Sequence, residues 1–138
     1  MNKEQVFEFV AKNPVFALAT AEENIPRVRY MMLYRADENG LIFNTGENKD
    51  LHAQLQANPQ VELCFIEPDK SMQIRIAGTV ETLEDLALKK QVVKDFPFLK
   101  EWVDGEGYDV LITYCLKNGL AIPWTMEKDS KPKEYIKL

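Results

Sequence analysis

The chain has 138 residues, of which 46% are hydrophobic and 28% charged, and its formal net charge at pH 7 is −5. This length is enough for one domain with a buried core, and the composition is that of an ordinary globular protein. The excess of acidic residues argues against general binding to nucleic acid or to anionic membranes, because both need a basic surface.

The first part of the chain predicts a helix followed by strands joined through short turns. Residues 2–12 have helical spacing, with Val6, Phe9 and Val10 on one face and Asn2 able to cap the N-terminus. An apolar run then indicates a strand at 15–20, and alternating side chains indicate a strand at 27–35. A hairpin turn at 37–40 leads into the paired strand at 41–45.

The second part continues with two more helical segments and a further set of strands. We predict helices at 49–57 and 83–96 and a helical turn at 98–103. Strands are expected at 61–67, 71–81, 109–116, 120–125 and 134–138. Hairpins with peripheral helices favour a single α+β domain over residues 1–138, mainly β, built as an antiparallel barrel of about six strands.

The sequence gives no sign of a membrane segment, an export signal or a metal site. Its uncharged stretches are far shorter than the roughly 20 apolar residues that span a bilayer. The N-terminal segment contains acidic residues and has no small-residue cleavage site, so we expect a cytoplasmic protein. Cys64 and Cys115 match no metal-binding or redox spacing and are expected to be reduced, buried thiols. The single histidine, His52, is expected to be exposed on a helix, and no side chain presents itself as a general acid or base.

The strand at 27–35 is the first candidate for a ligand-binding surface. One of its faces begins with Arg27 and Arg29 and continues with Met31 and Leu33, which would suit a ligand with an anionic tail and a flat apolar body. The alternative is a solvent-facing strand whose arginines pair with acidic residues.

Two further segments add donors for such a ligand. The helix start at 45–49 combines Thr45, Asn48 and Lys49, and unpaired N–H groups at a helix N-terminus bind phosphate. On the strand at 71–81, Gln73 lies on the face opposite the apolar residues, where its amide can donate and accept. The alternatives are simple capping by Asn48 beside an exposed lysine, and an exposed polar pair formed by Gln73 and Arg75.

Taken together, the segments FALAT, PRVRYMM, LIFNTGENKDL, LQANPQVELCF and MQIRIAGTVE resemble, in this order, the FMN-binding split barrels of the pyridoxamine 5′-phosphate oxidase-like family. The resemblance is greatest to short members grouped with general stress proteins and nitroimidazole-resistance proteins. It implies an antiparallel split barrel, FMN as cofactor, and a homodimer with FMN at the subunit interface.

The resemblance also implies which residues contact the cofactor. Arg29 would contact the flavin, and the segment Tyr30, Met31 and Met32 would run along its ring. The remaining implied contacts are Asn44, Thr45, Asn48, Lys49, Gln73 and Trp124, the last of them supplied by a partner subunit.

The resemblance leaves the activity open between three alternatives. The first is a flavin-dependent oxidoreductase of unknown substrate, in which the flavin would perform the redox chemistry. The second is a non-catalytic flavin-binding or stress-response module, and the third is a split barrel that binds haem or a deazaflavin. Asp50 and Leu51 stand where the full-length oxidases have an Arg-Lys pair, so a rearranged phosphate contact is expected. Oxidation of vitamin B6 is not implied, because this short chain has no recognisable counterpart of the C-terminal residues that hold pyridoxamine phosphate in those oxidases.

Overall fold

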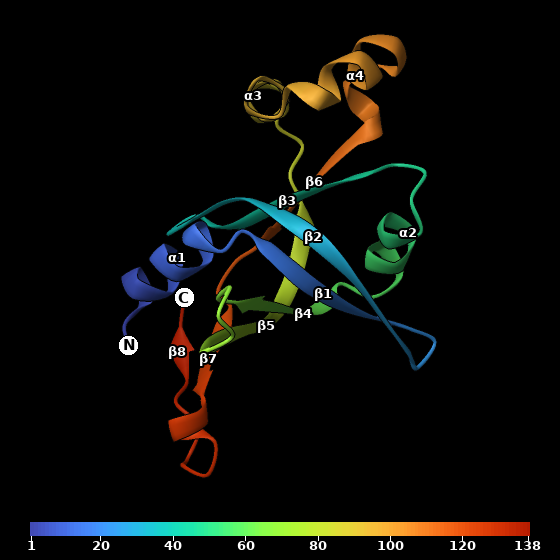
Figure 1. Ribbon diagram of the computed structural model, residues 1–138. Coiled ribbons are helices and arrows are strands. Elements are labelled where there is room, and N and C mark those ends of the chain that lie inside the picture. Colours follow the sequence, from blue (N-terminus) through green and yellow to red (C-terminus); the bar gives the residue numbers. More distant parts are fainter.

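The computed structural model describes residues 1–138, and an antiparallel β-barrel forms its centre (Figure 1). The strands are β1 (Val15–Glu22), β2 (Ile25–Asp37), β3 (Gly40–Gly46), β4 (Gln60–Ile66), β5 (Met72–Thr82), β6 (Leu111–Leu116), β7 (Leu120–Thr125) and β8 (Ile136–Lys137). Six of them close the barrel in the order β4-β1-β2-β3-β6-β5, because β5 pairs back with β4, and β7 and β8 continue the sheet beside β5. The predicted mainly-β barrel of about six strands is confirmed.

The chain has four α-helices, α1 (Lys3–Lys12), α2 (Asp50–Ala57), α3 (Leu86–Asp95) and α4 (Lys100–Glu106), of which α1 and α2 lie beside the barrel. Asn2 caps α1 as predicted, in a capping box with Gln5 that satisfies two backbone N–H groups. The predicted helix at 83–96 starts later than expected, because the side chain of Asp85 caps it by accepting from Leu88 N. None of the helices is long and apolar enough to cross a membrane.

The interior of the barrel is filled by alternate side chains from its strands. Phe16, Phe43 and Phe65 are almost fully buried, with ring centroids of Phe16 5.8 Å from Phe43 and 4.9 Å from Phe65. Phe43 also stacks on Tyr114 of β6 at 5.8 Å. These aromatic contacts join strands from both halves of the chain, so they hold the closed barrel together.

The outward surface of β1 and β2 is unexpectedly apolar. Val28, Tyr30 and Met32 are 70%, 81% and 49% exposed, and each is paired across the ladder with a small or β-branched residue of β1. We call this surface the outer apolar face, and define it by Val15, Ala17, Ala19, Val28, Tyr30 and Met32. Contiguous apolar sheet surfaces are typical of interaction sites.

A helical arm, residues 86–106 with α3 and α4 at its ends, projects from the barrel beyond β3 and β6 (Figure 1). It has its own small core of Val92, Val93 and Val103 against Leu111. The β2–β3 register shifts between Leu33 and Arg35, so Tyr34 occupies an irregular position from which its side chain reaches the arm. Tyr34 Oη donates to Asp95 Oδ2 at 2.6 Å, and its ring packs edge-on against Phe96.

We predict that Tyr34→Phe loosens this attachment in a pH-dependent manner. Burial first, and then the hydrogen bond to Asp95, raises the pKa of Tyr34 from 10.0 to about 12. Because the folded-state pKa is raised, the stabilisation is complete below about pH 10 and is lost as the pH rises towards about 12. At neutral pH the variant should lose roughly 0.5–1.5 kcal/mol of unfolding free energy.

The measurement is urea unfolding of both proteins at neutral pH and near pH 11. The difference between them should shrink at the higher pH, whereas a constant difference would exclude the hydrogen bond as its source. Tyr135→Phe is the control, because Tyr135 is exposed and makes no side-chain hydrogen bond.

Candidate cofactor site

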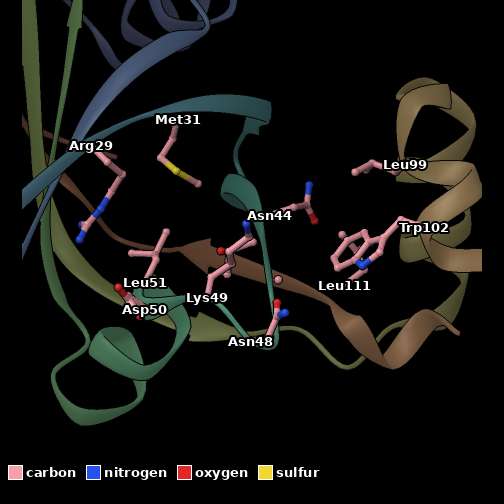
Figure 2. Close-up of a pocket in the computed structure, with 12 residues that line it drawn as sticks. Arg29, Met31, Asn44, Asn48, Lys49, Asp50, Leu51, Leu99, Trp102 and Leu111 are labelled. Atoms are coloured by element: carbon pink, nitrogen blue, oxygen red, sulfur yellow. The ribbon is translucent and has the colours of Figure 1, made fainter. Parts of the chain in front are cut away.

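A cleft of about 720 Å³ lies between the barrel and the helical arm, a size typical of small-molecule sites. In Figure 2, Arg29 and Met31 project from one side of it and Leu99 and Trp102 from the arm on the other, with Lys49 between them. The complete lining is Arg29, Met31, Asn44, Thr45, Gly46, Asn48, Lys49, Asp50, Leu51, Leu99, Trp102 and Leu111.

Arg29 enters the cleft from β2 and is held by neutral oxygen atoms. Its Nη1 donates to Thr20 Oγ1 at 2.9 Å and to Leu18 O at 3.3 Å, and its Nη2 donates to Gln54 Oε1. Thr20 and Gln54 are themselves buried, and Thr20 Oγ1 donates to Gln54 Oε1 at 2.8 Å. The guanidinium is therefore fixed in position without a carboxylate.

The other three arginines each face an acidic side chain. Arg27 lies 3.4 Å from Glu22, Arg35 lies 3.2 Å from Asp37, and Arg75 lies 3.4 Å from Glu62. The predicted alternative for the strand at 27–35, arginines that merely pair with acidic residues, thus applies to Arg27 and Arg35. Burial, followed by the charge of Arg27, holds the pKa of Arg29 below its usual value, but an arginine stays charged at neutral pH.

Asn44 contributes a buried amide N–H group that donates to no protein atom. Its Oδ1 accepts from Thr113 Oγ1 of β6 at 2.8 Å, which fixes the orientation of the amide. Its Nδ2 is buried and has no hydrogen-bond partner. Because an unpaired buried donor is costly, and because Asn44 lines the cleft, this atom is suited to a ligand acceptor.

The turn from β3 into α2 supplies the cationic end of the cleft. Lys49, rather than Asn48, is the N-cap of α2, and no side chain caps the helix, so capping by Asn48 is wrong. Lys49 is exposed and forms no ion pair. The turn packs closely over Gly46, since a Cβ there would lie 3.2 Å from Lys49 Cγ and 3.3 Å from Asn48 Oδ1. The uncapped helix start next to a free lysine is suited to an anion, although Asp50 places one carboxylate beside it.

The arm supplies the apolar wall of the cleft. Leu99 and Trp102 face it, and Leu111 at the start of β6 completes this side. Trp102 is half-buried and lies close to the turn, because a Cβ on Gly46 would be 3.4 Å from its Cη2. The segment was predicted only as a helical turn, and nothing local in its sequence indicates that it folds back towards β3.

The structure brings together six of the ten predicted cofactor residues: Arg29, Met31, Asn44, Thr45, Asn48 and Lys49. The other four lie elsewhere in the chain. Tyr30 and Met32 belong to the outer apolar face. Gln73 and Trp124 are paired across β5 and β7 and line a separate cavity of about 160 Å³, where Trp124 Nε1 donates to Asp129 Oδ1 at 2.9 Å.

Two expectations about reactive side chains are wrong. Cys64 is half-buried on the outward surface of β4, whereas Cys115 is buried as expected, and burial raises the pKa of both thiols. His52 is half-buried rather than exposed, because its Nδ1 lies 2.7 Å from Tyr114 Oη, which also accepts from Gln56. Neither cysteine nor His52 lines the cleft.

The sequence model of the family described as pyridoxamine 5′-phosphate oxidase matches residues 2–102. A pyridoxine/pyridoxamine 5′-phosphate oxidase of Anaeromyxobacter dehalogenans is 39% identical over 70 residues, which cover 50% of this chain and 35% of that relative. The comparison thus extends over about a third of the length of that curated relative.

Solved structures share the fold over most of the chain. A NimC/NimA family protein of Clostridium acetobutylicum has a TM-score of 0.79 at 25% identity, with 98% of this chain and 92% of that chain covered. A pyridoxamine 5′-phosphate oxidase-related, FMN-binding protein of Nostoc punctiforme has a TM-score of 0.65 at 16% identity, with 96% and 87% covered. The haem storage protein HutZ of Vibrio cholerae has a TM-score of 0.62 at 20% identity, with 85% and 90% covered. Because the family model matches well over half of its residues, the chain belongs to the pyridoxamine 5′-phosphate oxidase family.

Proposed function

We propose that this chain is a homodimeric FMN-binding protein and a flavin-dependent oxidoreductase that acts on a small molecule. The observation that carries the proposal is the cleft itself, which gathers six residues that the family resemblance assigns to FMN. These residues come from β2, β3 and the turn into α2, so the local sequence does not by itself bring them together.

The charges of the cleft support a ligand with one phosphate. Arg29 and Lys49 both lack an acidic partner, and the start of α2 offers backbone N–H groups without a cap. Two cations against the single carboxylate of Asp50 leave the lining with a net positive charge. An anionic group is attracted to such a site, whereas a cationic ligand is disfavoured.

The uncharged part of the cleft suits a ligand with a flat ring system. The free Nδ2 of Asn44 is a donor for a ring carbonyl or nitrogen, and Met31, Leu99 and Trp102 provide apolar surface around it. When bound, FMN would supply the electron transfer, and these residues would bind it, orient it and exclude water.

The outer apolar face supports the homodimer. Tyr30 and Met32 lie on it, and aromatic residues and methionine are enriched in protein interfaces. In the proposal, a second copy covers this face and its Gln73 and Trp124 complete the flavin site. This explains why these two residues lie apart from Arg29 within one chain.

A haem-binding function is the second candidate, because HutZ shares the fold and is named a haem storage protein. Haem iron is held by histidine, cysteine, methionine or tyrosine side chains. Met31 is the only residue of these types in the cleft lining, since His52 is hydrogen-bonded to Tyr114 elsewhere. The cleft therefore favours flavin over haem.

One experiment tests cofactor and assembly together. The purified protein, supplied with FMN, is separated by size-exclusion chromatography with light scattering and visible absorption recorded on the same peak. We expect twice the mass of one chain and the absorption bands of an oxidised flavin in that peak.

Bands of haem instead of flavin would support the second candidate. A colourless peak after incubation with FMN would contradict the flavin proposal, and a flavin-loaded monomer would contradict the shared site. Flavin that is bound but is reduced by neither NADH nor NADPH would support the non-catalytic module.

A further inference from the structure

We infer that Gln54, with Thr20, is the residue that positions Arg29 for its anionic ligand while leaving the charge of Arg29 intact. This inference rests on the proposed function, since it concerns the same cleft. Gln54 lies on α2 and is not part of the cleft lining, and neither it nor Thr20 is among the predicted cofactor residues.

The direction of each hydrogen bond follows from the chemistry of the groups. An arginine can only donate, so Thr20 Oγ1 accepts from Arg29 Nη1 and its own hydrogen goes to Gln54 Oε1. Gln54 Oε1 also accepts from Arg29 Nη2, so this one amide oxygen accepts hydrogen bonds from both Thr20 and Arg29. Gln54 is only 7% exposed and Thr20 only 4%, so neither side chain has much freedom to turn away.

The arrangement leaves part of the guanidinium available. Arg29 has five N–H donors, and Leu18 O, Thr20 Oγ1 and Gln54 Oε1 occupy three of them. The remaining two are free for a ligand, and the orientation of the planar group is set from the side of the barrel. Fixing the side chain before binding lowers the entropy cost of holding the ligand.

The side chain at position 54 is a neutral amide rather than a carboxylate. A glutamate of nearly the same shape would accept the same hydrogen bonds, but its charge would cancel that of Arg29. Arg27, Arg35 and Arg75 each have such a carboxylate, and Arg29 alone does not. A neutral acceptor therefore holds the arginine and leaves its attraction for an anion undiminished.

Two substitutions at position 54 separate the effect of the hydrogen bonds to Arg29 from the effect of its positive charge. Gln54→Glu keeps the shape and the acceptors but neutralises Arg29, so the Kd for FMN should rise roughly tenfold, the loss of one charge-assisted contact. Its Kd should also depend less on added salt than that of the unaltered protein, because one attracting charge is cancelled. Gln54→Met keeps the charge but removes the acceptor, so its Kd should rise while the salt dependence stays the same.

The matched control is Gln56→Glu, which adds the same charge to the same helix. Gln56 is exposed and donates to Tyr114 Oη rather than contacting Arg29, so the Kd should change little. Arg29→Gln tests the underlying site, and FMN titrations at low and high salt are made for all variants. Thermal melting shows which variants fold. If Gln54→Met does not fold, Gln54→Glu alone still tests the role of Gln54.

The role of Gln54 and the anion site itself give different results in these titrations. If Arg29→Gln weakens FMN binding but both Gln54 variants bind like the unaltered protein, the inference is overturned and the proposed site stands. If Arg29→Gln itself binds FMN with unchanged affinity and salt dependence, the proposed anion site fails, and the role of Gln54 fails with it. A weaker, less salt-dependent Gln54→Glu beside an unchanged Gln56→Glu supports the inference.

Discussion

Replacing Arg29 by alanine should weaken FMN binding by roughly 1.5–3 kcal/mol, equivalent to an approximately 10- to 100-fold rise in Kd. The reason is that Arg29 is the one arginine without a carboxylate partner, and it lines the cleft from a fixed position. Lys49→Ala should weaken binding in the same direction but by less, because Lys49 is exposed and water screens its charge. Titration of the apoprotein with FMN, followed by the quenching of flavin fluorescence, measures both.

Arg35→Ala is the matched control for Arg29→Ala. Arg35 lies on the same strand, carries the same charge and forms an exposed ion pair with Asp37, but it does not line the cleft. Its removal should leave the Kd for FMN nearly unchanged, since exposed ion pairs contribute little. Equal weakening in the Arg29 and Arg35 variants would indicate a general effect of charge rather than a defined site.

Phe43→Ala should have the largest effect on stability, with a loss of roughly 3–5 kcal/mol of unfolding free energy. Phe43 is fully buried at the centre of the barrel and packs against Phe16 of β1 and Tyr114 of β6. Its removal leaves a cavity between strands that are far apart in the sequence. Urea unfolding followed by circular dichroism measures the loss as a lower midpoint of the transition.

Phe98→Ala is the control for this prediction, because the side chain of Phe98 is 78% exposed on the arm. It removes the same group from a position where little apolar surface is buried, so its effect should be below about 1 kcal/mol. A loss at Phe43 no larger than that at Phe98 would contradict the assignment of Phe43 to the core.

The strands and their faces were largely predictable, because alternation along a strand is a local property of the sequence. The face that bears Arg29, Met31 and Leu33 was identified correctly, and Leu33 is buried in the barrel. The direction of the opposite face was harder to predict from the sequence, because Val28 and Tyr30 are apolar and yet point outwards. Apolar residues at an interaction surface and in a core have the same pattern, so alternation alone does not separate them.

The site was predictable where it is built from one continuous segment, and it was missed where the chain folds back. Asn44, Asn48 and Lys49 follow one another through β3 and its turn, so a helix start and the family resemblance indicate them together. Trp102 reaches the same cleft through the arm, whose position depends on Tyr34 and Asp95. Gln54 was missed for another reason, since a buried polar residue on a short helix has no pattern that distinguishes it from a solvent-exposed one.

The bond between Asn44 and Thr113 has a consequence for the order in which the protein forms. The two residues are 69 positions apart in the sequence, and they meet only when β6 pairs with β3 and the barrel closes. Contacts between such distant residues slow the folding of a domain. The cleft is therefore complete only in the native chain, and any ligand that needs Asn44 has no binding site on partly folded states. Such a ligand would bind the native state alone, so the free energy of unfolding would rise with the free concentration of the ligand.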